Sequence, residues 1–338
     1  MRTARRITRM LLPGLVALVA GCGSSSSAPE LLVYTSRHDE LVAPVFAAYT
    51  RATGIHIRYV TDSAGALIER LQAEGGSSPA DLLLTADAGN LWRAARAGVL
   101  APLDSVVLNA NVPARLRDPR GRWFALSRRA RTLVYNTQRV DPANLSSYAA
   151  LADPRWKGRL CLRTSHNIYN RSLVATMIKH LGPGKTSQVL RGWVANLATN
   201  VFSNDTALME AMVAGQCDVG IVNTYYYGVM KRNNPQLPLA LFWANQQSSG
   251  VHINIAGGGL TRHAPHRRLA RKLLEWLSQA EGQQLLANAN LEFPVNPAVE
   301  PADEEKGWGR FRADALPVKV AGELHHKAVM LMQQAGYQ

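Results

Sequence analysis

The sequence has few of the residues that build common catalytic and metal sites. Only three cysteines occur among 338 residues, and there is neither a CxxC pair nor an HExxH motif. A zinc site of the usual kind is therefore not indicated. The sequence also lacks a nucleophile elbow, a paired-carboxylate motif and a dedicated general base. We predict that the protein is not an enzyme.

Long apolar runs are scarce as well. The N-terminal apolar stretch, residues 10–20, is too short to cross a bilayer comfortably. It follows four arginines and leads into Val19-Ala20-Gly21-Cys22, which reads as a lipobox. We predict a lipoprotein signal peptide over residues 1–21, lipidation of Cys22 and a serine-rich tether over residues 22–29. The protein is then expected in the periplasm, held to the membrane only by its lipid. A generic signal peptide with a chance cysteine is the alternative.

Acidic residues are outnumbered, at 24 against 38 lysines and arginines, which gives a formal charge of +14. Signal cleavage removes four arginines and no acid, so the mature chain keeps +10. The basic residues do not form runs interleaved with aromatics, so we do not expect nucleic-acid binding. The positive charge is better explained by a basic surface near anionic lipid or by a need to bind anions.

Cys161 and Cys217 lie in strand-like segments of an exported chain. They form either a disulfide or two buried thiols.

Short apolar segments alternate with amphipathic ones along the mature chain. Residues 31–35, 56–60 and 81–85 read as strands with helices between them, and residues 159–163 and 217–223 begin a second such unit. This alternation predicts an α/β fold with parallel strands, whose ligands bind beyond the strands' carboxyl ends. No flexible linker separates the units. If there are two lobes, we expect extended strands to join them as a hinge.

Three consecutive tyrosines, Tyr225 to Tyr227, follow a strand-like segment at residues 218–222. Their hydroxyls are either satisfied by packing partners or available to a ligand. Phenolate is a hard donor, but free tyrosine titrates near pH ~10, so only a cation that strongly favours the deprotonated form would be bound. Calcium and magnesium prefer carboxylates and carbonyls. A trivalent ion such as Fe(III) is the natural partner.

Five segments, taken in order, resemble the ferric-binding proteins of the periplasmic iron-ABC-transporter family. These segments are Leu32-Val33-Tyr34-Thr35-Ser36-Arg37-His38, Ser78-Pro79-Ala80-Asp81-Leu82-Leu83-Leu84-Thr85, Ala125-Leu126-Ser127-Arg128-Arg129-Ala130-Arg131, Asn223-Thr224-Tyr225-Tyr226-Tyr227 and Glu292-Phe293-Pro294-Val295-Asn296-Pro297. The resemblance implies a two-lobed periplasmic binding protein of type II-like fold, with Fe(III) in the cleft. It also implies delivery to an inner-membrane permease powered by an ATPase. We expect a monomer, with residues 30–130 plus 256–306 in lobe 1 and residues 131–255 plus 307–338 in lobe 2.

The resemblance also assigns the ligands. Tyr225 and Tyr226 match the family's pair of phenolate ligands, whereas Tyr227 is expected to pack. His38 matches a histidine ligand that follows the first strand. The segment containing Tyr169, Ser165-His166-Asn167-Ile168-Tyr169-Asn170, resembles that of a third tyrosine ligand in a cyanobacterial branch of the family.

Lobe 1 departs from both family patterns. The cyanobacterial branch has a tyrosine where this chain has Asp39, which either ligates the metal or, as we favour, caps a helix beginning at Glu40. The other branch has a glutamate where this chain has Ala86. The neighbouring Asp87 either replaces that glutamate or caps the next helix.

Two arginines, Arg129 and Arg131, alternate in the expected hinge, so one of them is placed to face the cleft. The resemblance puts Arg129 beside the metal, where it would hold a carbonate-like anion or hydrogen-bond a tyrosinate. We group both arginines with Asn223 and Asp87 as anion-binding or supporting residues. The alternative function is a binding protein of the same fold for an organic cation or a phosphorylated small molecule, with the tyrosines as an aromatic wall.

Overall fold

The computed structural model describes residues 29–338. The predicted signal peptide, Cys22 and all but the last residue of the tether lie outside this range. Within it, no helix has the length and apolar character needed to cross a bilayer. Eight strands form one sheet in the order β2-β1-β3-β8-β4-β6-β5, with β7 paired to β4.

Lobe 1 is built on the first part of this sheet. Strands β1 (Glu30–Thr35), β2 (His56–Thr61) and β3 (Leu82–Ala86) are parallel, and β8 (Ile253–Leu260) runs antiparallel to β3. Its helices are α1 (Asp39–Thr53), α2 (Ala64–Glu74), α3 (Ala88–Arg96), α4 (Val106–Asn111), α8 (Arg267–Ser278) and α9 (Ala280–Asn290). Their apolar faces meet the sheet in one buried core.

Lobe 2 has its own buried cores. Strand β5 (Leu160–Cys161) is parallel to β6 (Val219–Asn223), and β7 (Leu239–Phe242) pairs with β4. Its helices are α5 (Ile168–Asn196), α6 (Asp205–Val213), α7 (Thr224–Asn233) and α12 (His325–Gln334). Two short helices, α10 (Asp303–Gly307) and α11 (Val320–Glu323), lie on the C-terminal connection. Helix α5 is interrupted at Gly182, whose φ of 75° is not helical.

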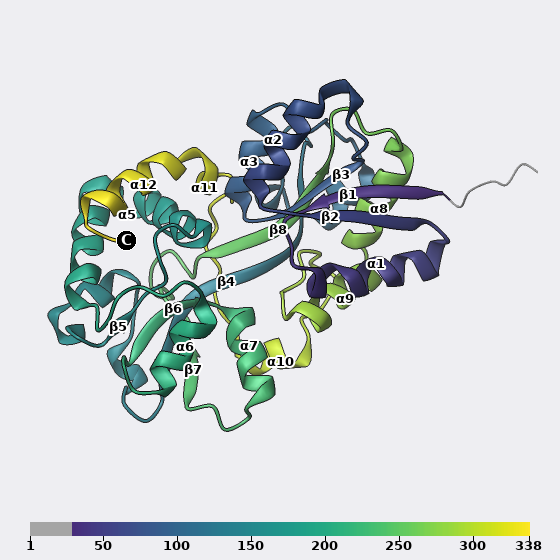
Figure 1. Cartoon of the computed structure of the whole chain (residues 1–338). Coiled ribbons are helices and arrows are strands. Elements are labelled where there is room, and N and C mark those ends of the chain that lie inside the picture. The colour runs from purple at the N-terminus through teal and green to yellow at the C-terminus, as the bar shows by residue number, and fades with distance from the viewer. Residues whose placement is uncertain (1–28) are drawn as a thin grey trace, which may run out of the picture.

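Two strands pass from one lobe to the other, as Figure 1 shows. The first half of β4 (Phe124–Asn136) pairs with β8, and its second half pairs with β6 and β7. The expected connection through extended strands is therefore present. The predicted lobe boundaries, after residues 130 and 255, fall inside these strands and remain a prediction.

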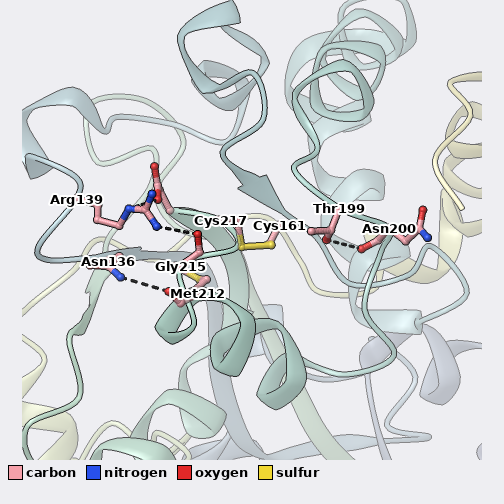
Figure 2. The surroundings of a disulfide bond; sticks show 9 residues. Asn136, Arg139, Cys161, Thr199, Asn200, Met212, Gly215 and Cys217 are labelled. Carbon is pink, nitrogen blue, oxygen red and sulfur yellow. Dashed lines mark hydrogen bonds and ion pairs between the residues drawn. A yellow bond between two sulfur atoms is a disulfide. The ribbon is translucent and has the colours of Figure 1, made fainter.

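A disulfide joins Cys161 to Cys217, so the structure has the bonded alternative rather than two thiols. Figure 2 shows the bond between Cys161, the last residue of β5, and Cys217, which lies two residues before β6. Beside it, Arg139 donates to the carbonyl of Gly215 at 2.7 Å, and Asn136 donates to the carbonyl of Met212 at 3.3 Å. The bond thus ties β5 to the segment that leads into β6.

Candidate metal centre

The tyrosine pair lies in the first turn of α7, directly after β6. The rings of Tyr225 and Tyr226 are neighbours, with centroids 4.1 Å apart and planes inclined by 33°. Tyr227 lies on another side of the helix and is buried, and its hydroxyl donates to the carbonyl of Leu239 at 3.3 Å. Its hydroxyl therefore already has a partner inside lobe 2.

A third phenol reaches the pair from α5. The side chain of Asn167 caps this helix by accepting from the backbone N–H of Tyr169 at 2.9 Å. The cap places Tyr169 in the first turn, where it interacts with Tyr225 and Tyr226. Three phenols from two helix N-termini are thus brought together in lobe 2.

Two arginines flank the three phenols. The guanidinium carbon of Arg129 lies 5.1 Å from the ring centroid of Tyr169, and that of Arg163 lies 5.6 Å from the same centroid. Arg129 is 1% exposed, and its Nε and Nη2 have no hydrogen-bond partner among residues 29–338. These two buried donors are available to an anion or to a phenolate.

Burial makes two of the three phenols harder to deprotonate. Burial raises the pKa of Tyr225 well above its usual value, and Tyr169 and Tyr226 raise it further, whereas Arg129 lowers it. Burial also raises the pKa of Tyr169, against the lowering effect of Arg129. A ligand that needs phenolates must therefore displace protons, which a hard, highly charged cation does best.

The hollow between the lobes has a volume of about 780 Å³. Its lobe 1 wall includes His38 and Leu41, and its lobe 2 wall includes Tyr225, Tyr226 and Val229. His38 is exposed at the N-terminus of α1, on the side of lobe 1 where β1 ends. The structure therefore places His38 across the hollow from the tyrosine pair.

Asp39 does not cap α1, so the favoured interpretation of this residue was wrong. The helix begins at Asp39 itself, and its N-cap is His38, whose side chain makes no capping bond. The Asp39 carboxylate instead accepts a hydrogen bond from the hydroxyl of Tyr59, on β2. This partner was not visible in the sequence because it comes from another strand.

Asp87 takes the role of a cap. It is fully buried and accepts from the backbone N–H of Gly89 at 2.6 Å, at the start of α3. It also accepts from Ser172 at 2.8 Å and from Asn254 at 2.5 Å. Burial raises the pKa of Asp87, and these donors oppose that effect. The carboxylate thereby ties α3 of lobe 1 to α5 of lobe 2 and to β8.

Arg131 points into lobe 2 rather than toward the cleft. Its guanidinium donates to Asp205 at 3.0 Å, to Asn170 at 2.9 Å and to Asn223 at 3.2 Å. Asn223 is also buried, and its side-chain oxygen is occupied by this contact. Of the two alternating arginines, Arg129 is the one that lies beside the phenols.

Two functional candidates were missed by sequence reasoning. Glu292 is 3% exposed and binds Arg37 at 2.8 Å and Arg129 at 3.1 Å, so it fixes the guanidinium beside the phenols. Arg163 pairs with Asp205 at 3.4 Å while it flanks Tyr169. The sequence did offer one indication for Glu292, because it is the single acidic residue of a largely apolar segment that contains prolines. Its partners Arg37 and Arg129 could not be predicted, because they lie far away in the chain.

Comparisons with known proteins identify the family of this chain. Residues 77–309 match the family described as bacterial extracellular solute-binding proteins. Iron uptake protein A1 of Synechocystis sp. is 37% identical over 335 residues, covering 95% of this chain and 93% of that protein. The structure of Trichodesmium IdiA (FutA) in complex with iron and citrate superposes with a TM-score of 0.87 at 39% identity, covering 91% of this chain and 100% of that one. A ferric binding protein from Campylobacter jejuni gives a TM-score of 0.86 at 33% identity, covering 91% and 100% of the two chains.

Proposed function

This chain belongs to the bacterial extracellular solute-binding proteins, and from that premise we propose that it binds Fe(III) for an iron ABC importer. One observation carries the choice of ligand: Tyr169, Tyr225 and Tyr226 converge beside the buried Arg129. Phenolates are hard donors that suit a hard trivalent ion. The names of the relatives above, which refer to iron uptake and ferric binding, support this choice.

The ligand set comprises the three tyrosines and His38. Three phenolates cancel the charge of Fe(III). Arg129 and Arg37 share a single carboxylate, Glu292, so one positive charge remains beside the site and favours a bound anion. The two free donors of Arg129 suit a carbonate-like anion or a carboxylate of citrate. The Trichodesmium structure holds citrate with its iron. The Asp39 carboxylate is a further hard donor. To bind the ion, it would have to give up its hydrogen bond from Tyr59.

Binding begins in lobe 2, where the phenols are already grouped. Closure about β4 and β8 then brings His38 from lobe 1 onto the ion, because His38 lies across the same hollow. The closed protein, a periplasmic monomer held to the membrane through Cys22, docks on a permease whose ATPase drives uptake. The positions of the side chains support this order of binding, and the family supports the choice of partners.

Single Tyr→Phe variants test the ligand set with little change in shape. Replacing Tyr169, Tyr225 or Tyr226 should each lower ferric affinity by more than about 100-fold, the upper end of what supporting residues around a metal contribute. Tyr227→Phe is the matched control and should leave the affinity unchanged. Affinity is measured by competition with a ferric chelator. Equal affinities for all four variants would refute the proposal.

A further inference from the structure

Lobe 1 carries an exposed basic surface around the start of α8. Residues 267 and 271, and likewise residues 268 and 272, are four positions apart, so their side chains lie side by side on one face of the helix. The opposite face of α8 is apolar and packs in the core of lobe 1. Together with one arginine before the helix, these residues form what we call the basic surface: Arg262, Arg267, Arg268, Arg271 and Lys272, all exposed.

The charges of the basic surface are largely uncompensated. Glu275 pairs with Arg271 at 2.7 Å, and the buried carboxylate of Asp81 lies 3.2 Å from Nδ1 of His266. In the described part of the chain, none of the other four cations forms a salt bridge. Five cations against two carboxylates leave a net charge of +3.

Helix stability does not explain where these charges lie. The first turn of α8 contains no acidic residue and begins with Arg267 and Arg268. Positive charge at this position opposes the helix dipole, which favours anions at the N-terminus of a helix and cations at its C-terminus. A partner outside the fold is therefore the better explanation of the two arginines.

The chain enters lobe 1 beside the basic surface. The Asp81 carboxylate accepts from the backbone N–H of Leu32, the third residue of β1, at 3.0 Å and from the backbone N–H of His266 at 2.6 Å. The backbone N–H of Thr261 donates to the carbonyl of Asp81 at 3.0 Å. Thr261 and His266 bracket the turn that carries Arg262 and leads into α8. The start of β1 and the basic surface therefore share one end of lobe 1.

The predicted anchor determines which partner can reach this end of the lobe. Cys22 precedes Glu30, the first residue of β1, by eight positions. Eight residues span at most about 28 Å, and a random coil of that length averages about 16 Å. Lipidation of Cys22 would therefore hold the basic surface close to the phospholipid headgroups.

We propose that the basic surface of lobe 1 rests on the anionic phospholipid headgroups of the membrane that holds the protein. Opposite charges attract the two surfaces, and each lysine or arginine near an anionic bilayer strengthens binding about fivefold. The tether adds to this effect, because it keeps the basic surface at a high effective concentration near the lipid. The proposal rests on the anchor at Cys22, which is part of the proposed function, but not on iron binding.

The metal hollow would then face away from the bilayer. Strand β1 has six residues and is about 20 Å long, and His38 lies beyond its other end, in the wall of that hollow. Figure 1 shows β1 running from the outer end of lobe 1 toward lobe 2. A protein that rests on lipid through its basic surface would therefore present its hollow to ions that arrive from the periplasm.

Co-sedimentation with phospholipid vesicles tests the proposal. The protein is the mature chain, residues 22–338, with Cys22→Ser so that no lipid anchor contributes. We expect it to bind vesicles made of equal parts of phosphatidylglycerol and phosphatidylethanolamine, but not vesicles of phosphatidylcholine. Binding should be lost when NaCl is raised from about 0.05 to about 0.5 M, which shortens the Debye length from about 14 to about 4 Å.

A triple variant removes the charge of the basic surface. Arg267→Gln/Arg268→Gln/Lys272→Gln eliminates three cations, each of which contributes about fivefold. The variant should therefore bind the anionic vesicles up to about 100-fold more weakly, and at least about tenfold more weakly. Because all three positions are exposed, its urea unfolding midpoint should match that of the parent protein.

A second triple variant is the matched control. Lys179→Gln/Lys185→Gln/Arg191→Gln removes the same net charge from exposed positions on α5 of lobe 2. It should weaken vesicle binding by at most about twofold, because charges far from the contact are screened.

The proposal would be overturned by a lack of binding to the anionic vesicles, by equal binding to phosphatidylcholine, or by equal losses in the two triple variants. Mass spectrometry of the wild-type protein extracted from its membrane reports separately on the lipidation of Cys22. The ferric spectrum of each variant reports separately on the metal centre.

Discussion

Removal of the Cys161–Cys217 disulfide should weaken the part of lobe 2 that holds the phenols. Arg163 follows Cys161 by two residues, and β6, which leads to Tyr225 and Tyr226, begins two residues after Cys217. The bond therefore joins the two segments that carry one flanking arginine and the tyrosine pair. We expect both stability and ferric affinity to depend on it.

The sequence separation sets the size of the effect. Cys161 and Cys217 are 56 residues apart, and closing a loop of that length removes about 14 cal/mol/K of entropy from the unfolded chain. At 25 °C this corresponds to about 4 kcal/mol of stability. With a urea dependence of about 3 kcal/mol per molar, the unfolding midpoint of lobe 2 should fall by about 1.3 M.

Urea unfolding with and without a reductant measures this shift, and the double variant Cys161→Ala/Cys217→Ala serves as the control. The buried Trp156 and Trp193, both in the lobe 2 core, report the transition by fluorescence. The wild type should lose stability on reduction, and the variant should be equally weak with and without reductant. The reasoning would be refuted if reduction left the urea midpoint of the wild type unchanged. It would also be refuted if reduction lowered the midpoint of the double variant as much as that of the wild type.

Three further predictions concern charge. Arg129→Gln should lower ferric affinity about 10- to 100-fold, measured by competition with a chelator. The control Arg96→Gln, on the exposed face of α3, should leave the affinity unchanged. Equal ferric affinities of the two variants would exclude a role for the buried guanidinium. Burial raises the pKa of Tyr225 and of Tyr169, so iron must displace their protons when it binds. Ferric affinity should therefore rise about tenfold per pH unit for each proton released. A ferric affinity that does not change between about pH 6 and 8 would contradict this. Burial raises the pKa of Glu305 from 4.5 to about 7, so ionisation disfavours the folded state and stability should fall by up to roughly 3 kcal/mol as pH rises through that window. Glu305→Gln should abolish this fall in urea titrations; an unchanged pH profile in the variant would place the cause elsewhere.

The alternation of apolar and amphipathic segments was enough to predict the fold class. It works because buried parallel strands need continuous apolar runs, which residues 31–35 and 81–85 supply. The tyrosine run was found because phenols after a buried strand are unusual and chemically specific. The connection through extended strands was predicted because the sequence has no flexible linker between the two units. Strands β4 and β8 form that connection.

The remaining features depend on contacts between distant segments. The hydroxyl of Tyr59 donates a hydrogen bond to Asp39, and Glu292 forms a salt bridge with Arg129, although the members of each pair are far apart in the sequence. No local pattern encodes such partners, because they meet only after the sheet has formed. The wrong interpretation of Asp39 has the same origin: a capping preference is local, and here a tertiary hydrogen bond prevails.

The visible spectrum of the purified protein with ferric citrate tests the central claim most directly. Phenolate ligation of Fe(III) by Tyr225 and Tyr226 predicts an absorption band between about 400 and 500 nm that saturates at one iron per protein. The double variant Tyr225→Phe/Tyr226→Phe should lack this band. Tight iron binding without such a band, or a band that survives in the double variant, would contradict the account.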